Sequence, residues 1–365
     1  MKKIMPLQSL RALCVIIVML VHANHYSGLL HLHYLAASAV TTFLVLSGFI
    51  ISKVYFDKIN NKEELFIFFK KRFFRMYPMH LLLLLIFLII EFVKLYLEKN
   101  YNINVNNNAF STNNTLSFLS NFFLLNIFNH SVTFNIPAWT VSAEFLTSIF
   151  FGVICFGLKK NYLKSYFLLL TSFIIFFIFI FFQKNFITYN GIFALLSVIF
   201  CFIIGFFCFK IFISKNSLFI ILSNNYVQIL NLIILFLLNY FQILAFNFIL
   251  PICCGVIIIY LCKIKQGNFF GKIFFSNSLI YIGKISYTLY MTHFLVYWIY
   301  TQIFRHILKL EETYSFENTL FIENHFMVYI SKSLLFFVTT FLISHFLYNK
   351  FEKKFIQISH NKNLY

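Results

Sequence analysis

Long, mostly apolar runs of residues constrain the fold of this chain more than any other feature of its sequence. Residues 79–90, 167–182 and 227–238 are examples. Hydrophobic residues make up 61% of the 365 residues and charged residues only 11%, about half the charged fraction of a soluble domain. An apolar run of about 20 residues crosses a lipid bilayer as one helix. The chain is therefore predicted to be an all-α, polytopic integral membrane protein.

The apolar runs predict about ten transmembrane helices. Loops rich in Lys and Arg follow every second predicted span, and the intervening loops are poor in cations or balanced by Glu. Because cation-rich loops face the cytoplasm, both termini are predicted to be cytoplasmic. The short apolar stretch 115–128 is predicted to be re-entrant or to lie on the outer side. The predicted spans are 6–24, 35–55, 79–97, 138–158, 165–182, 191–212, 226–243, 247–262, 285–303 and 326–348.

The formal net charge of +18 does not indicate nucleic-acid binding, because the cations cluster in the loops between apolar runs. The seven Cys residues lie in apolar segments and show no paired C-x-x-C spacing. Neither a disulfide framework nor a metal site is therefore expected. We expect one membrane domain over residues 1–365, without a soluble domain before or after it.

The first predicted span carries Arg11 near its start and His22 near its end. The two residues share nearly the same helical face and are about 16 Å apart along the axis, about half of the hydrocarbon core. Placing an ionisable residue inside a transmembrane span costs free energy, so such a residue is a functional candidate. Neutral imidazole accepts a proton near pH 7, so His22 is a candidate general base. The alternative is a structural His22 that bonds to a neighbouring helix carbonyl.

Two further motifs carry ionisable residues. Arg72 and Arg75 precede Pro78 at the predicted inner end of the third span, and their spacing places both guanidinium groups on one side of a helix. They can grip the phosphates of a nucleotide-like ligand, or they can serve only as topology-setting cations. Glu144 is predicted about two turns inside the outer surface, away from this inner mouth. It can orient an imidazole, bind sugar hydroxyls or act as a buried structural acid.

Five motifs occur in order along the chain: Arg11-x10-His22, FLVLSGFIIS (43–52), KKRFFRMYP (70–78), PAWTVSAEF (137–145) and LIYIGKISYTLYMTHF (279–294). Together they resemble the membrane-bound acyltransferase 3 family, the O-acyltransferases of bacterial inner membranes that modify cell-surface glycans. The tail LYNKFEKKF (347–355) resembles the closing segment of the family, although Lys354 stands where Pro is common.

The resemblance implies specific roles for these residues. His22 and Arg11 match the family's essential His and Arg, and Glu144 matches the Glu of its Trp-(Ser/Thr)-x-(Ser/Ala)-x-Glu segment. Arg72 and Arg75 match the Arg-x-x-Arg motif that is associated with the acyl-CoA donor. The other motif residues singled out, as contacts of the acceptor or as structural residues, are Trp139, Ser142, Tyr287 and His293.

The implied function is O-acyl transfer, most simply O-acetyl transfer, from cytoplasmic acyl-CoA to a hydroxyl of an extracytoplasmic glycan. Acetyl-CoA is then a donor substrate, and no cofactor is bound. The implied partners are the lipid bilayer and a surface glycan or lipid-linked sugar. Many relatives carry a fused extracytoplasmic SGNH domain. Because this chain ends at Tyr365 without one, we expect the acceptor to be handled by the membrane domain itself or by a separate extracytoplasmic partner protein. The alternative function is a transporter or flippase of a lipid-linked sugar, in which His22 is a gating residue or couples transport to proton movement.

Overall fold

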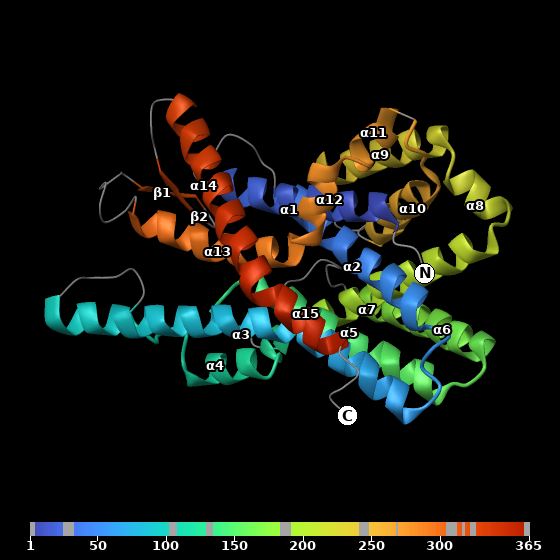
Figure 1. Ribbon diagram of the computed structural model, residues 1–365, viewed down its shortest axis with the longest axis horizontal. Helices are drawn as coiled ribbons and strands as arrows, with labels where there is room; N and C mark the ends of the chain where they lie inside the picture. Colours follow the sequence, from blue (N-terminus) through green and yellow to red (C-terminus); the bar gives the residue numbers. More distant parts are fainter. Residues whose placement is uncertain are drawn as a thin grey trace.

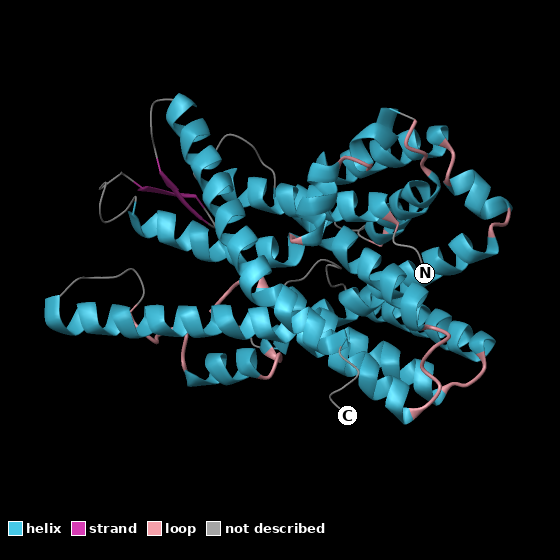
Figure 2. Cartoon of the chain, viewed as in Figure 1, coloured by secondary structure: helices cyan, strands magenta, loops and turns pink. Residues whose placement is uncertain are grey.

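The computed structural model is a bundle of helices with one small β-ribbon (Figures 1 and 2). The residues that the structure describes are 4–24, 33–101, 108–128, 134–182, 191–240, 248–267, 269–303, 312–315, 318–321 and 326–360.

Seven helical stretches in the described residues are long and apolar enough to cross a membrane. The last of them, Ser331–Ser359, runs through most of α14 (Phe326–Leu347), a π-helical turn (Tyr348–Glu352) and most of α15 (Lys353–His360). The other six are α1 (Met5–Asn24), α2 (His33–Tyr55), α3 (Lys62–Tyr101), α5 (Ala138–Gly157), α6 (Asn161–Phe181) and α7 (Gly191–Ser214).

Three shorter helices coincide with the remaining predicted spans. They are α9 (Asn225–Tyr240), α10 (Ile249–Lys263) and α13 (Ser286–Gln302), with 16, 15 and 17 residues. Each predicted span therefore overlaps a helix, whereas seven helical stretches meet the length and hydropathy expected of a span. The total of ten spans and the cytoplasmic termini stay predictions.

Helix α3 differs most from its predicted form. The sequence places the start of the third span at residue 79, just after Pro78, but the helix is continuous over 40 residues and Pro78 lies inside it. At 1.5 Å per residue its length is about 60 Å, about twice the hydrocarbon core of a bilayer. Arg72 and Arg75 therefore lie within the body of this helix, as the helical spacing of the two residues predicts.

The remaining elements are short. The stretch 115–128 forms α4 (Thr115–Phe122) and a 3₁₀ turn (Asn126–Phe128) that packs against α5 and α7. Asn126 and Ile127 are buried there against other helices, and whether the stretch is re-entrant or lies on the outer side stays a prediction. The all-α prediction is confirmed as the fold class, and its one departure among the described residues is the short antiparallel ribbon of β1 (Glu312–Ser315) and β2 (Asn318–Phe321), magenta in Figure 2. The other short helices are α8 (Ser217–Leu222), α11 (Phe269–Phe274) and α12 (Asn277–Lys284).

Two features fix helices to neighbouring segments. Gly205 of α7 lies so close to α2 that a Cβ atom on it would collide with the carbonyl oxygen of Val45. At the far end of α3, the buried carboxylate of Glu91 accepts hydrogen bonds from the Phe110 backbone N–H and the Asn113 side chain, at 2.9 and 2.8 Å. Lys94 Nζ is 3.0 Å from the same carboxylate, and its positive charge compensates the negative charge of Glu91. The first contact joins two membrane helices, and the second holds residues 110 and 113 against α3.

We predict that Gly205→Ala lowers the free energy of unfolding by about 1–3 kcal/mol, because the added methyl group would push two helix backbones apart. Unfolding of the purified protein in a detergent titration measures this change. Gly157→Ala is the matched control, since a Cβ atom there meets nothing within 4 Å. Equal stability of the two variants would contradict the tight contact between α2 and α7.

Candidate functional site

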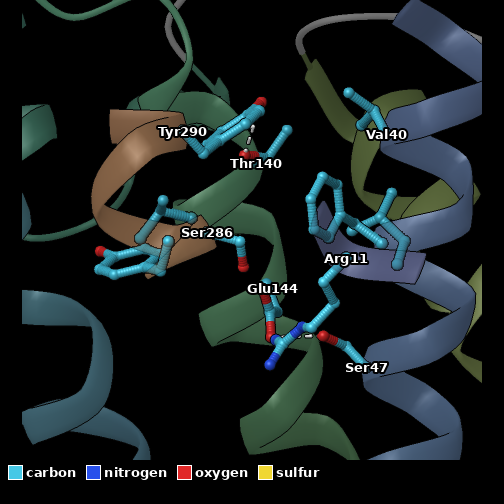
Figure 3. A pocket seen from close by; sticks show the side chains of 11 residues that line it. Arg11, Val40, Ser47, Thr140, Glu144, Ser286 and Tyr290 are labelled. Carbon is cyan, nitrogen blue, oxygen red and sulfur yellow. Dashed lines mark hydrogen bonds between the residues drawn. The ribbon is translucent and has the colours of Figure 1, made fainter. Parts of the chain in front are cut away.

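A cluster of polar side chains from four helices forms the centre of the candidate site. Arg72 of α3 donates from Nη2 to Glu144 Oε1 of α5 at 2.5 Å, and Ser47 Oγ of α2 donates to the same oxygen at 2.8 Å. Arg11 of α1 points toward this carboxylate from the side (Figure 3). The predicted separation of Glu144 from the inner mouth is therefore wrong. The long α3 brings Arg72 to the level of Glu144, where the two opposite charges pair.

A second ion pair lies beside the first. Arg75 Nη1 donates to the carboxylate of Glu352, which is only 2% exposed and also accepts a hydrogen bond from the Thr288 hydroxyl. Glu352 belongs to the π-helical turn between α14 and α15. Glu352 is not among the residues predicted for the site. The signal available was the tail segment 347–355, in which Glu352 is the only acidic residue.

A chamber of about 590 Å³ opens next to these ion pairs. The cations that line it are Arg11, Lys71, Arg72, Arg75 and Lys284. Tyr55 and Tyr348 also line it, together with apolar side chains of α2 and α12 and with Ile356 and Ser359 of α15. We call it the inner chamber. Its lining combines positive charge, aromatic rings and apolar surface, which suits a ligand with phosphates and an apolar arm.

A second, much smaller cavity of about 60 Å³ adjoins the inner chamber, and we call it the small chamber. Arg11 and Ser47 line both chambers and therefore stand at their junction. Figure 3 shows Arg11, Ser47 and Glu144 at one end of the small chamber and Thr140 and Tyr290 at the other. A volume of this size holds no more than a few water molecules.

His22 lies beyond the small chamber, in the last turn of α1. Its Nδ1 is 2.9 Å from the carbonyl oxygen of Val18, and because a carbonyl only accepts, the hydrogen must be on Nδ1. The lone pair of the neutral ring is then on Nε2, as a general base needs. His22 lines neither chamber, so the structure does not bring it to Arg11.

His293 of α13 connects His22 with the small chamber. The two imidazole rings are edge to face with centroids 4.8 Å apart, and the centroid of the Tyr290 ring is 5.6 Å from that of His293. The Thr140 hydroxyl donates to the Tyr290 hydroxyl at 3.2 Å. His293 is fully buried, and neither ring nitrogen has a hydrogen-bond partner among the described residues. A buried imidazole without a hydrogen bond is rare, and a role of His293 beside His22 in the reaction accounts for it.

The other predicted motif residues have structural contacts. Ser142 is fully buried and donates to the Leu124 carbonyl oxygen at 2.5 Å, which anchors the stretch 115–128 to α5. Tyr287 donates to the Met76 carbonyl oxygen at 2.6 Å and thereby ties α13 to α3. Trp139 is half-buried and packs against the main hydrophobic core. These contacts support the structural alternative for Ser142, Tyr287 and Trp139.

Metal-binding groups do not gather at this site. Within the described ranges, no three His, Cys, Asp or Glu side chains come together as a metal ion requires. The Cys residues are free thiols, and six of the seven are buried.

Comparison with known proteins gives one match. The family model described as an acyltransferase domain, that of the acyltransferase 3 family, matches residues 7–349, which include every motif residue discussed above except Glu352 and the α15 residues. No curated protein and no solved structure matches the chain.

Proposed function

This chain belongs to the acyltransferase 3 family, and on that premise we propose that it transfers an acetyl group from cytoplasmic acetyl-CoA to a glycan hydroxyl outside the bacterial inner membrane. The family and the long apolar helices make the protein a multi-pass membrane acyltransferase. The donor, the acceptor and the sidedness are the proposal. Both termini are then cytoplasmic, as the loop charges predict.

The observation that carries the proposal is the inner chamber and its junction with the small chamber. Five cations and two Tyr rings line a cavity large enough for the nucleotide part of acyl-CoA. Arg11 and Ser47 stand where this cavity meets the small chamber, and Tyr290 and His293 lead from there to His22. This order of groups along α1 and α13 supports a path from one membrane side to the other.

The chemistry follows from this path. With the nucleotide in the inner chamber, the flexible pantetheine arm extends past Arg11 and carries the thioester toward His22. The acceptor oxygen attacks the thioester carbonyl carbon while His22 takes the hydroxyl proton. The carbon–sulfur bond breaks, and the CoA thiolate receives the proton from His22. In the second route, Nε2 of His22 attacks the thioester carbonyl carbon, the carbon–sulfur bond breaks and CoA leaves as the thiolate. The acceptor oxygen then attacks the acyl-imidazole, the carbon–nitrogen bond breaks, and the hydroxyl proton passes to the CoA thiolate.

Sealed vesicles test the direction of transfer. In inside-out vesicles the inner chamber faces the medium, so externally added acetyl-labelled CoA should label glycan enclosed in the vesicles. The charged donor should not cross the bilayer unaided. Right-side-out vesicles should therefore stay unlabelled until they are permeabilised, and His22→Ala vesicles should show no label in either orientation.

Equal labelling in both orientations would refute the proposed sidedness. A purified protein that neither hydrolyses nor exchanges acetyl-CoA, yet supports movement of a lipid-linked sugar, would favour the transporter alternative.

A further inference from the structure

The two ion pairs raise a question about donor binding. Arg72 is held by Glu144 and Arg75 by Glu352, so a carboxylate already neutralises each guanidinium. An anionic ligand gains less from a neutralised guanidinium than from a cation without a counter-charge, because the paired carboxylate repels it. The strongest phosphate-binding groups of the inner chamber should therefore be its other cations.

Lys71 and Lys284 are these cations. Among the described residues, neither has a carboxylate within ion-pair distance, and both line the inner chamber. Lys71 precedes Arg72 on α3 and is half-buried, whereas Lys284 at the end of α12 is exposed. Arg11 is the remaining cation, but it stands at the junction with the small chamber. The two lysines therefore provide the unpaired positive charge of the chamber outside that junction.

The fold holds Lys284 in this position. Its neighbour Gly283 lies so close to α1 that a Cβ atom would collide with the carbonyl oxygen of Gln8, which fixes α12 against α1. The ammonium group of Lys284 lies 5.5 Å from the centre of the Tyr348 ring, within the range of a cation–π contact. A lysine that is placed by its helix and supported by an aromatic ring loses less side-chain freedom when it binds a ligand.

We propose that Lys71 and Lys284 bind the phosphates at the nucleotide end of the acyl-CoA donor. This inference rests on the proposed function and deepens it. Acyl-CoA carries a diphosphate and a separate 3′-phosphate at the end far from the thioester. Cations away from the junction suit that end, and Tyr55 and Tyr348 offer ring faces to the adenine. Arg72 and Arg75, held by their carboxylates, then shape the passage toward the small chamber.

The test compares two donors that differ only in the nucleotide. We expect Lys71→Gln and Lys284→Gln each to raise the KM for acetyl-CoA about three- to tenfold, the effect of losing one partly solvated charge contact. The KM for S-acetylpantetheine, which lacks the nucleotide, should not change. Lys70→Gln and Lys272→Gln are matched controls, because these lysines lie on α3 and α11 but do not line the inner chamber.

Binding of adenosine 3′,5′-bisphosphate provides a readout without catalysis. The bisphosphate should raise the melting temperature of the wild-type protein and raise that of each lysine variant less. An equal KM rise for both donors, or unchanged KM values and unchanged bisphosphate binding, would overturn the inference. If instead the wild type neither binds the bisphosphate nor cleaves acetyl-CoA, the proposed function itself fails. These two failures are therefore distinguishable.

Discussion

His22→Ala should lower acetyl transfer by about 10²–10⁴-fold, the contribution of a positioned general base. Removal of the imidazole eliminates both routes proposed for the reaction, because His22 either takes the acceptor proton or carries the acyl group. The variant should still insert and accumulate, since Ala is compatible with the last turn of α1. Initial rates with purified protein, normalised to membrane content, measure the effect.

His345→Ala serves as the matched control for this prediction. His345 of α14 is exposed and bonds to Tyr281 and Asn349, away from both chambers. Its replacement should leave the rate of transfer close to that of the wild type. Retention of more than about a tenth of the activity in His22→Ala would contradict a general-base or acyl-carrier role.

Glu144→Gln should lower kcat by about 10- to 100-fold without raising the KM for acetyl-CoA. The amide can still accept hydrogen bonds from Arg72 and Ser47, but it no longer holds Arg72 by charge or balances Arg11 at the junction. Small displacements of positioning groups cost up to about 100-fold in rate. Loss of a negative charge near an anionic donor does not weaken donor binding.

The separate effects on kcat and KM decide this prediction. Glu98→Gln is the control, because Glu98 is at the far end of α3, where it accepts a bond from the Ala109 backbone N–H. A selective rise of the KM in Glu144→Gln would instead place its carboxylate in direct support of donor binding. An unchanged kcat would show that the contact between Arg72 and Glu144 serves stability alone.

Helix positions were predictable from the sequence where hydropathy decides them. All ten predicted spans overlap helices because an apolar run of this length has few alternatives to a helix in lipid. The start of α3 was not predictable in this way. Pro78 indicates a helix start, yet an interior Pro is tolerated in membrane helices because neighbouring groups satisfy the freed backbone. The β1–β2 ribbon lies in a polar connection, where hydropathy carries little information.

The site was predictable in its residue types but not in its pairings. Counting turns from the start of α5 gives the position of Glu144 along its own helix but does not identify its neighbours. Its partner Arg72 lies beside it because α3 is long enough to extend to that level. Glu352 in an amphipathic tail resembles a solvated charge until α15 packs over α3 and buries it against Arg75. The contact between His22 and His293 joins helices from opposite ends of the chain, which spacing within a motif cannot indicate.

The backbone contact at Gly205 has a consequence for how an acyl group passes through the protein. Helices α2 and α7 interlock at this glycine, so sliding one past the other would break a close backbone contact. Helix α2 forms one wall of the small chamber, and α13 faces it through Tyr290. A cavity of about 60 Å³ must widen before a pantetheine arm can enter it. With α2 held by α7, the widening is expected from the other walls, which belong to α1, α5 and α13, and we expect the frequency of that excursion to set an upper limit on turnover.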